Sequence, residues 1–96
     1  SKKIVNNYKN KILNIHPSLL PRYKGLSTHR RVIKNNEKYT GCTVHVVNSK
    51  LDSGKIILQK KIKILKKDNE NSLSKRVLKI ENIVYPKAVK KFISNL

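Results

Sequence analysis

An amide and an imidazole stand two residues apart at the end of a short apolar run, as Asn14 and His16 in "KILNIHPSLLP". In a β-strand, residues i and i+2 point to the same face, so these side chains would converge on one spot. An Asn amide donates a hydrogen bond to a polarised carbonyl oxygen. A protonated His does likewise and then gives its proton to a leaving group. The pair therefore predicts half of an acyl-transfer site that stabilises an oxyanion.

A carboxylate beside His16 would favour the charged imidazole. The chain has only five acidic residues, and Asp52 lies in the turn "LDSG" between two predicted strands, where functional groups are common. Asp52 is therefore the third candidate. Chemistry alone favours the structural alternative, in which Asn14 and His16 are strand-end residues satisfied by backbone and Asp52 shapes its turn.

The other histidines are predicted to be structural. His45, beside Thr43 on a predicted strand face, is expected to be packed or hydrogen-bonded rather than catalytic, and His29 is expected on a helix surface. Three dispersed His and one Cys show no metal-ligand spacing, so we expect no metal. The lone Cys42 excludes an intramolecular disulfide and predicts a reducing, cytoplasmic location.

Two elements in the first half must position the pair. "KILNIH" (11–16) predicts a buried strand that ends at Pro17, which cannot donate to a strand ladder. The polar residues 1–10 are expected to be the tail of a helix or a loop. "STHRRVIKNN" predicts a helix with Ser27 or Thr28 as its capping residue.

The second half predicts two strands and a helix. "CTVHVVN" alternates, with Cys42, Val44 and Val46 on one face, and "KIILQKKIKIL" follows the turn as a longer strand. That strand is expected to place four residues on one side: Ile56, Leu58, Ile62 and Ile64. The last segment, capped by Asp68 or Asn69, predicts a helix with an apolar stripe of Leu73, Val77, Ile80, Val84, Ala88 and Phe92. Pro86 is expected to kink or split it near Tyr85.

The order strand-helix-strand-strand-helix predicts an α/β fold with an incomplete sheet and an unpaired edge. Ninety-six residues make one domain at most, and without any Met we do not expect Ser1 to be a natural start. We therefore expect residues 1–96 to form a single partial domain of a longer chain. No run is apolar over the roughly 18 residues of a membrane span.

The charge is extreme, with 23 Lys and Arg against 5 acids, hence +18. One interpretation is a small basic nucleic-acid-binding module without catalysis. The favoured interpretation is the composition of an A/T-rich genome, because Lys, Asn and Ile are over-used together and the lysines are dispersed. Arg and aromatic residues, which contact and stack on bases, are also few.

A resemblance to a known family favours the catalytic interpretation of Asn14, His16 and Asp52 over the structural one. "NIHPSLLPRYKG", followed by "THRR", "GCTVHVV", "LDSGKIILQ" and "RV…E…YP", closely resembles the phosphoribosylglycinamide formyltransferase family. The similarity runs from about Lys11 to the end and matches the C-terminal half of that family's three-layer catalytic domain. Asn14, His16 and Asp52 fall at the family's catalytic Asn, His and Asp.

The resemblance implies transfer of a formyl group from the cosubstrate 10-formyltetrahydrofolate to the amine of glycinamide ribonucleotide, in purine biosynthesis. It implies that Asn14 and protonated His16 stabilise the oxyanion and that Asp52 keeps His16 charged. No tightly bound cofactor, metal, membrane or nucleic-acid partner is implied.

The resemblance also implies two sets of binding residues. The folate-binding set is Asn14 with Asn48, Ser49, Lys50, Leu51 and Asp52. The nucleotide-substrate set is Leu78, Lys79, Ile80 and Glu81, although the family commonly has a polar residue where Leu78 stands.

The chief departure is the family's N-terminal Gly-rich phosphate-binding loop, which the isolated Gly25, Gly41 and Gly54 cannot supply. We therefore expect residues 1–96 alone to be inactive and to need the missing half of the same domain. Two relatives remain as alternatives. Formyltetrahydrofolate deformylase usually has a second His where Pro17 stands, and methionyl-tRNA formyltransferase lacks the "TGCTVHVV" match.

Overall fold

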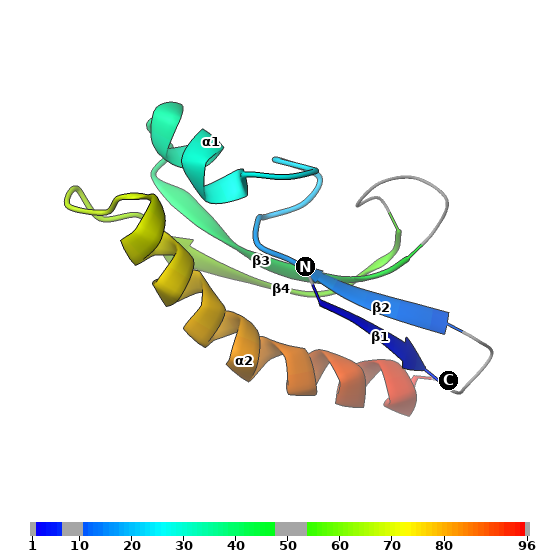
Figure 1. The fold of residues 1–96 in the computed structure, drawn as a ribbon. Helices are drawn as coiled ribbons and strands as arrows, with labels where there is room; N and C mark the ends of the chain where they lie inside the picture. The colour runs from blue at the N-terminus through cyan, green and yellow to red at the C-terminus, as the bar shows by residue number, and fades with distance from the viewer. Residues whose placement is uncertain (1, 7–10, 48–53, 96) are drawn as a thin grey trace.

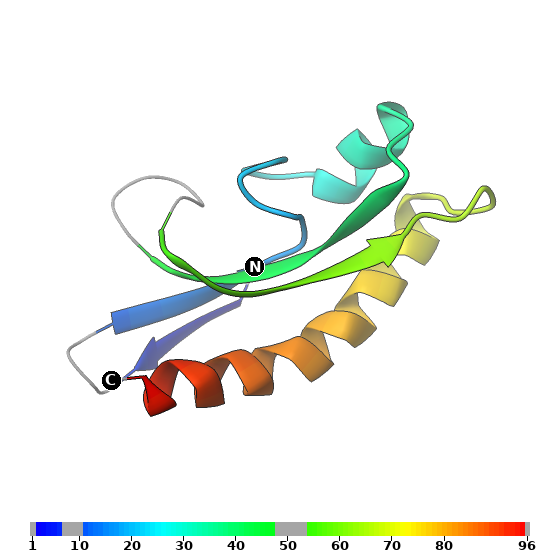
Figure 2. The same ribbon diagram turned by 180° about the vertical axis from the view of Figure 1, so that it is seen from behind.

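One antiparallel sheet organises the chain, with its strands in the order β1-β2-β3-β4. The computed structural model describes residues 2–6, 11–47 and 54–95 of the chain. The strands are β1 (Lys2–Asn6), β2 (Lys11–His16), β3 (Tyr39–Val46) and β4 (Ile56–Lys63), and the helices are α1 (Thr28–Lys34) and α2 (Glu70–Ser94). Helix α2 lies along one face of the sheet, while α1 packs at its end beside the start of α2 (Figures 1 and 2). The predicted α/β fold is confirmed.

The beginning of the chain differs from the expectation. Residues 1–10 were expected to be a loop or helix tail, but Lys2–Asn6 forms β1 and pairs antiparallel with β2. An apolar strand such as β2 exposes backbone N–H and C=O groups that need partners, and β1 supplies them on its outer side. Within the described residues, the edge of β2 that we expected to be open is therefore paired.

The core lies between the sheet and α2. Leu13 and Ile15 of β2 and Cys42 and Val44 of β3 are almost fully buried, as the predicted alternation requires. They pack against the predicted apolar stripe of α2, whose buried members are Leu73, Val77, Val84 and Ala88. Ile80 and Phe92 pack at the margin of this core, so the predicted stripe is confirmed.

Strand β4 carries an irregularity that the alternating pattern does not reveal. Val44 pairs with Leu58, but the next residue, His45, pairs with Ile56, so Ile57 is the extra residue of a β-bulge. Leu58, Ile62 and Ile64 pack against the core as predicted. The prediction for Ile56 is wrong. The bulge turns it to the opposite face, where it is 42% exposed.

Pro86 was expected to kink or split the last helix near Tyr85; helix α2 runs without interruption through Pro86, so it is not split there. Pro86 is exposed, while Val84 and Ala88 on either side are buried against the sheet and hold both halves in place. The predicted cap at Asn69 is confirmed. Its Oδ1 accepts from the Ser72 backbone N–H (2.8 Å), and Ser72 Oγ accepts from the Asn69 N–H (2.9 Å).

The segment between β2 and α1 turns sharply. The Leu20–Pro21 peptide bond, whose isomer the sequence leaves open, is cis. Tyr23, Gly25 and Ser27 have left-handed backbone angles, with φ of 56°, 86° and 57°. Ser27 occupies the predicted N-cap position of α1, but its side chain makes no capping hydrogen bond.

Candidate active site

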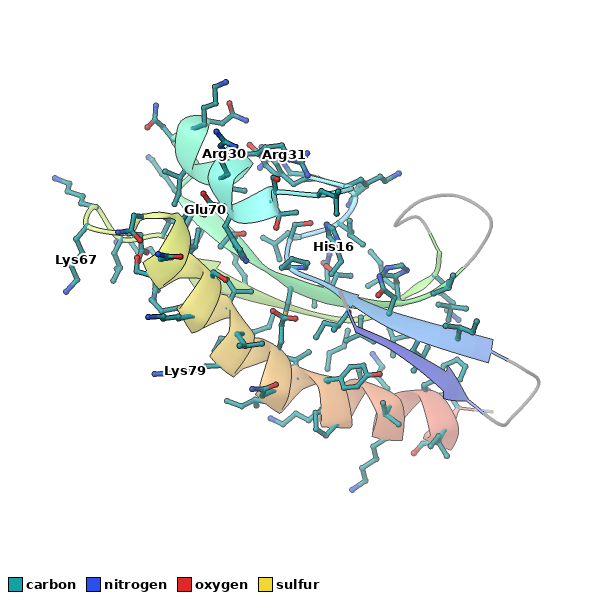
Figure 3. All side chains as sticks on the ribbon, in the orientation of Figure 1. His16, Arg30, Arg31, Lys67, Glu70 and Lys79 are labelled. Atoms are coloured by element: carbon teal, nitrogen blue, oxygen red, sulfur yellow. The ribbon has the colours of Figure 1, made fainter. Side chains whose placement is uncertain are left out.

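Four polar side chains occupy the face of the sheet opposite α2. Asn14 and His16 of β2 lie directly across from His45 and Thr43 of β3, and we call these four residues the polar quartet. None is more than 3% exposed. Because buried polar groups must be hydrogen-bonded to be tolerated, a polar layer of this kind is costly unless its partners are built in or a ligand supplies them. Figure 3 shows His16 on the side of the sheet away from α2.

Asn14 is held by the histidine opposite. Its Nδ2 lies 3.0 Å from His45 Nε2, and His45 Nδ1 lies 3.2 Å from the Val46 carbonyl oxygen. A carbonyl oxygen only accepts, so Nδ1 carries the proton of the neutral ring. Nε2 is then an acceptor and takes a hydrogen bond from the Asn14 amide. The prediction that His45 is hydrogen-bonded is confirmed.

The other end of the Asn14 amide is unsatisfied. Its Oδ1 is buried and has no hydrogen-bond partner in the part of the chain whose side chains the structure describes, residues 12–47 and 54–95. Native proteins leave few such groups, and each one marks strain, a missing water or a ligand site. Asn14 is therefore the side chain of the quartet that has an unused hydrogen-bonding group among the described residues.

His16 is fixed by the segment that follows it. Its Nε2 donates to the Tyr23 carbonyl oxygen at 2.8 Å. The Tyr23 hydroxyl donates to Glu37 Oε2 at 2.7 Å, and Arg22 forms an ion pair with the same carboxylate. Arg31 Nη2 donates to the Lys24 carbonyl at 2.6 Å. The imidazole therefore faces a backbone that is tied to α1 and the turn after it.

Thr43 fixes the other end of this segment. Its Oγ1 donates to the Ser18 carbonyl (2.7 Å) and accepts from the Leu20 N–H (3.1 Å). Gln59 of β4 donates to the Leu20 carbonyl (2.7 Å) and to Thr43 Oγ1 (2.9 Å). The segment 17–27 is therefore pinned over the polar face by β3 and β4. We call it the covering segment.

His29 was expected on a helix surface, but it is only partly exposed. It is half-buried on α1, and its Nδ1 is buried without a partner among the described residues. Burial lowers the pKa of His29, Glu70 at the start of α2 opposes this, and the nearby His16 adds to it. His29 thus lies within electrostatic range of the candidate imidazole.

The other predicted site residues fall into two groups. Asp52, with Asn48, Ser49, Lys50 and Leu51, lies outside the described residues. The nucleotide-substrate set lies on α2, across the sheet from Asn14 and His16. Leu78 is 45% exposed, Lys79 points away from His16 (Figure 3), and Ile80 packs against the core.

Glu81, the fourth member of that set, lies near Cys42 on the core side of the sheet. Burial, with the charge of Glu81 in addition, raises the pKa of the Cys42 thiol to about 11. Cys42 is therefore a buried, protonated thiol rather than a nucleophile.

No group of three or more His, Cys, Asp or Glu side chains gathers into a metal site within the described ranges. No helix there is long and apolar enough to cross a membrane.

Comparison with known proteins decides the family. The family model for formyl transferases matches residues 1–89. The chain belongs to the formyl transferase family. The phosphoribosylglycinamide formyltransferase of Escherichia coli K12 is 41% identical over 92 residues, which cover 96% of this chain and 43% of that protein. The trifunctional purine biosynthetic protein adenosine-3 of Chironomus tentans is 43% identical over 86 residues, covering 90% of this chain and 6% of that protein.

Solved formyl transferase structures give the same result. Glycinamide ribonucleotide transformylase 1 from Symbiobacterium toebii aligns with a TM-score of 0.83 and 42% identity, over 86% of this chain and 39% of that one. Phosphoribosylglycinamide formyltransferase from Bacillus halodurans aligns with a TM-score of 0.82 and 38% identity, over 85% of this chain and 42% of that one. The chain therefore spans less than half the length of these relatives.

Sequence reasoning did not identify the link between His45 and Asn14. The two residues are 31 positions apart, and only the β2–β3 register places them opposite each other. An alternating strand pattern shows which face a residue occupies but not which residue it meets.

Proposed function

We propose that the full-length protein transfers a formyl group from 10-formyltetrahydrofolate to the amine of glycinamide ribonucleotide. The observation that carries this proposal is that two buried side chains able to donate hydrogen bonds, the Asn14 amide and the His16 imidazole, share one face of β2. The names of the relatives supply the substrates, since the E. coli and Haemophilus influenzae proteins are phosphoribosylglycinamide formyltransferases.

The chemistry follows from the two donors. The substrate amine attacks the formyl carbon, a C–N bond forms, and negative charge gathers on the formyl oxygen. An N–H of Asn14 and an N–H of His16 stabilise that oxygen in a site from which water is excluded. The intermediate then collapses as the bond to the folate nitrogen breaks, and the proton lost by the amine reaches that nitrogen with the help of His16. For this role, His16 Nε2–H must exchange the Tyr23 carbonyl for the substrate oxygen.

Other parts of the site are proposed from the resemblance. Asp52 keeps His16 charged, and residues 48–52 bind folate largely through main-chain groups. Glu81 and its neighbours on α2 contact the nucleotide substrate, with the contact at Leu78 the weakest. The cytoplasm is the proposed location, in keeping with a buried free thiol at Cys42.

The test is a choice among acceptors. The full-length protein is given 10-formyltetrahydrofolate with glycinamide ribonucleotide, with water alone, or with charged initiator tRNA. We expect rapid folate release only with glycinamide ribonucleotide. Equal release in water alone would identify a deformylase, and formylation of tRNA would identify the other relative. A protein that binds duplex DNA or RNA tightly at physiological salt and turns over nothing would be the basic binding module.

A second measurement concerns residues 1–96 by themselves. The three glycines are isolated, so nothing in this stretch forms a Gly-rich phosphate loop. We expect the purified 96-residue chain to show no formyl transfer at any concentration of either substrate. Turnover at the rate of the full-length protein would refute this.

A further inference from the structure

We propose that His45 is a positioning residue for formyl transfer, whose Nε2 lone pair orients the Asn14 amide so that its second N–H points at the reacting oxygen. The inference rests on the proposed function for its chemistry. Its geometry rests on the described residues alone. His45 is not expected to touch either substrate.

The hydrogen-bond chain has a defined direction. His45 Nδ1 donates to the Val46 carbonyl oxygen, which can only accept, and this leaves Nε2 as the acceptor of the neutral ring. The opposite tautomer would place two lone pairs face to face at the Val46 contact. Asn14 must therefore present its Nδ2 end to His45, as it does at 3.0 Å. The backbone carbonyl of β3 thus sets the orientation of a side chain on β2.

This orientation matters because a primary amide has two N–H groups in one plane. One is taken by His45, so the direction of the second is fixed relative to the strand. Had the amide turned over, its acceptor oxygen would stand where the second donor now stands. An acceptor facing a developing oxyanion would raise the barrier rather than lower it.

The surroundings keep this arrangement rigid. Asn14 and His45 are directly opposed in the β2–β3 ladder and are 3% and 2% exposed, so water has little access to replace either partner. Asn14 Oδ1 has no partner among the described residues, so the hydrogen bond from Nδ2 to His45 is the contact that orients the amide there.

Two substitutions of His45 distinguish its proposed role in orienting the Asn14 amide from a role in packing alone. His45→Gln keeps an acceptor near the position of Nε2, whereas His45→Phe keeps much of the ring volume and removes the acceptor. We expect His45→Phe in the full-length protein to lower kcat by roughly 10²-fold, the usual effect of misplacing a catalytic group. KM for glycinamide ribonucleotide should stay unchanged, and His45→Gln should recover most of the loss in kcat. A change in KM alone, or equal kcat in both variants, would overturn the proposal.

A double-mutant cycle tests whether His45 acts through Asn14. Asn14→Ala removes the donor itself, so adding His45→Phe to that variant should lower kcat no further. Independent, multiplicative losses would show that His45 works by another route. Urea unfolding of each variant measures its free energy of unfolding and shows whether a loss of kcat accompanies a loss of stability.

A spectroscopic measurement needs neither substrate nor turnover. Nitrogen-15 NMR of the wild-type imidazole should show His45 protonated at Nδ1 and unprotonated at Nε2, with the Asn14 side-chain NH₂ protons shifted apart by the hydrogen bond. A ring protonated at Nε2 would overturn the inference even if the enzyme transfers formyl groups. Conversely, a wild-type protein that is inactive with glycinamide ribonucleotide would refute the proposed function, while the NMR result would still decide the contact.

Discussion

The protonation of His29 predicts a dependence of stability on pH. His29 is half-buried on α1 and lies within electrostatic range of both His16 and Glu70. Its pKa is lowered chiefly by burial, so the folded protein resists the charged form more than the unfolded chain does. In the pH range between the lowered pKa and the unfolded value of 6.5, the unfolded state binds more protons.

We therefore predict that the contribution of neutral His29 to the free energy of unfolding is fully present above the unfolded pKa. This contribution is lost as the pH falls from the unfolded pKa towards the lowered pKa of the folded protein. Urea unfolding of the full-length protein at about pH 8 and about pH 5.5 brackets that unfolded value. The free energy of unfolding should decrease on acidification, and His29→Gln, which cannot take up the proton, should reduce the decrease. An identical pH dependence in wild type and variant would show that His29 does not contribute.

At the scale of the elements, the covering segment depends on one hydroxyl of β3. Thr43 Oγ1 bonds to Ser18, Leu20 and Gln59, so it ties the segment to two strands at once. Thr40 lies on the same strand and is equally buried, but its Oγ1 has no partner among the described residues. The two threonines therefore form a matched pair for measuring what these hydrogen bonds contribute.

Thr43→Val should lower the free energy of unfolding by about 1–3 kcal/mol, because it leaves buried backbone groups of Ser18 and Leu20 unpaired. It should also lower kcat, since the carbonyl that faces His16 belongs to the same segment. Thr40→Val, the control, removes an unpaired hydroxyl and should leave stability unchanged or raise it. Equal effects of the two substitutions would show that the hydrogen bonds of Thr43 are not what holds the segment.

The strands also show which structural features a local sequence pattern can predict and which it cannot. Period-two alternation placed Asn14 and His16 on one face correctly, because that face follows from the strand itself. It failed at Ile56, because one bulge residue, Ile57, reverses the alternation and is visible only in the pairing with β3. The pairing of Lys2–Asn6 with β2 was missed for a related reason, since this short segment has only Ile4 and Val5 as apolar residues and its pairing depends on the edge of a neighbouring strand.

At the scale of the whole molecule, the excess of positive charge bears on how substrates arrive. The chain carries +18 formal charges, and both proposed substrates are anions, one a phosphate ester and the other a carboxylate. A protein field of this sign raises the rate of encounter with anions, and salt screens it. The charge therefore has a kinetic consequence even if it originates in genome composition.

We expect kcat/KM of the full-length protein to fall steeply as added salt shortens the Debye length from about 30 Å to about 3 Å, while kcat changes little. A glycinamide riboside without the phosphate is the matched control, and its kcat/KM should depend less on salt. Salt dependence of the same size for both acceptors would exclude steering of the phosphate by the protein's charge.

Turnover of His16→Ala in the full-length protein tests the central claim most directly, namely that side chains on the polar face of the sheet stabilise the oxyanion of formyl transfer. With glycinamide ribonucleotide and 10-formyltetrahydrofolate both saturating, kcat should fall by about 10³-fold or more, because an oxyanion donor and a proton carrier are lost together. Binding of both substrates should persist. A kcat within tenfold of wild type, roughly 1.4 kcal/mol of barrier, would contradict the account.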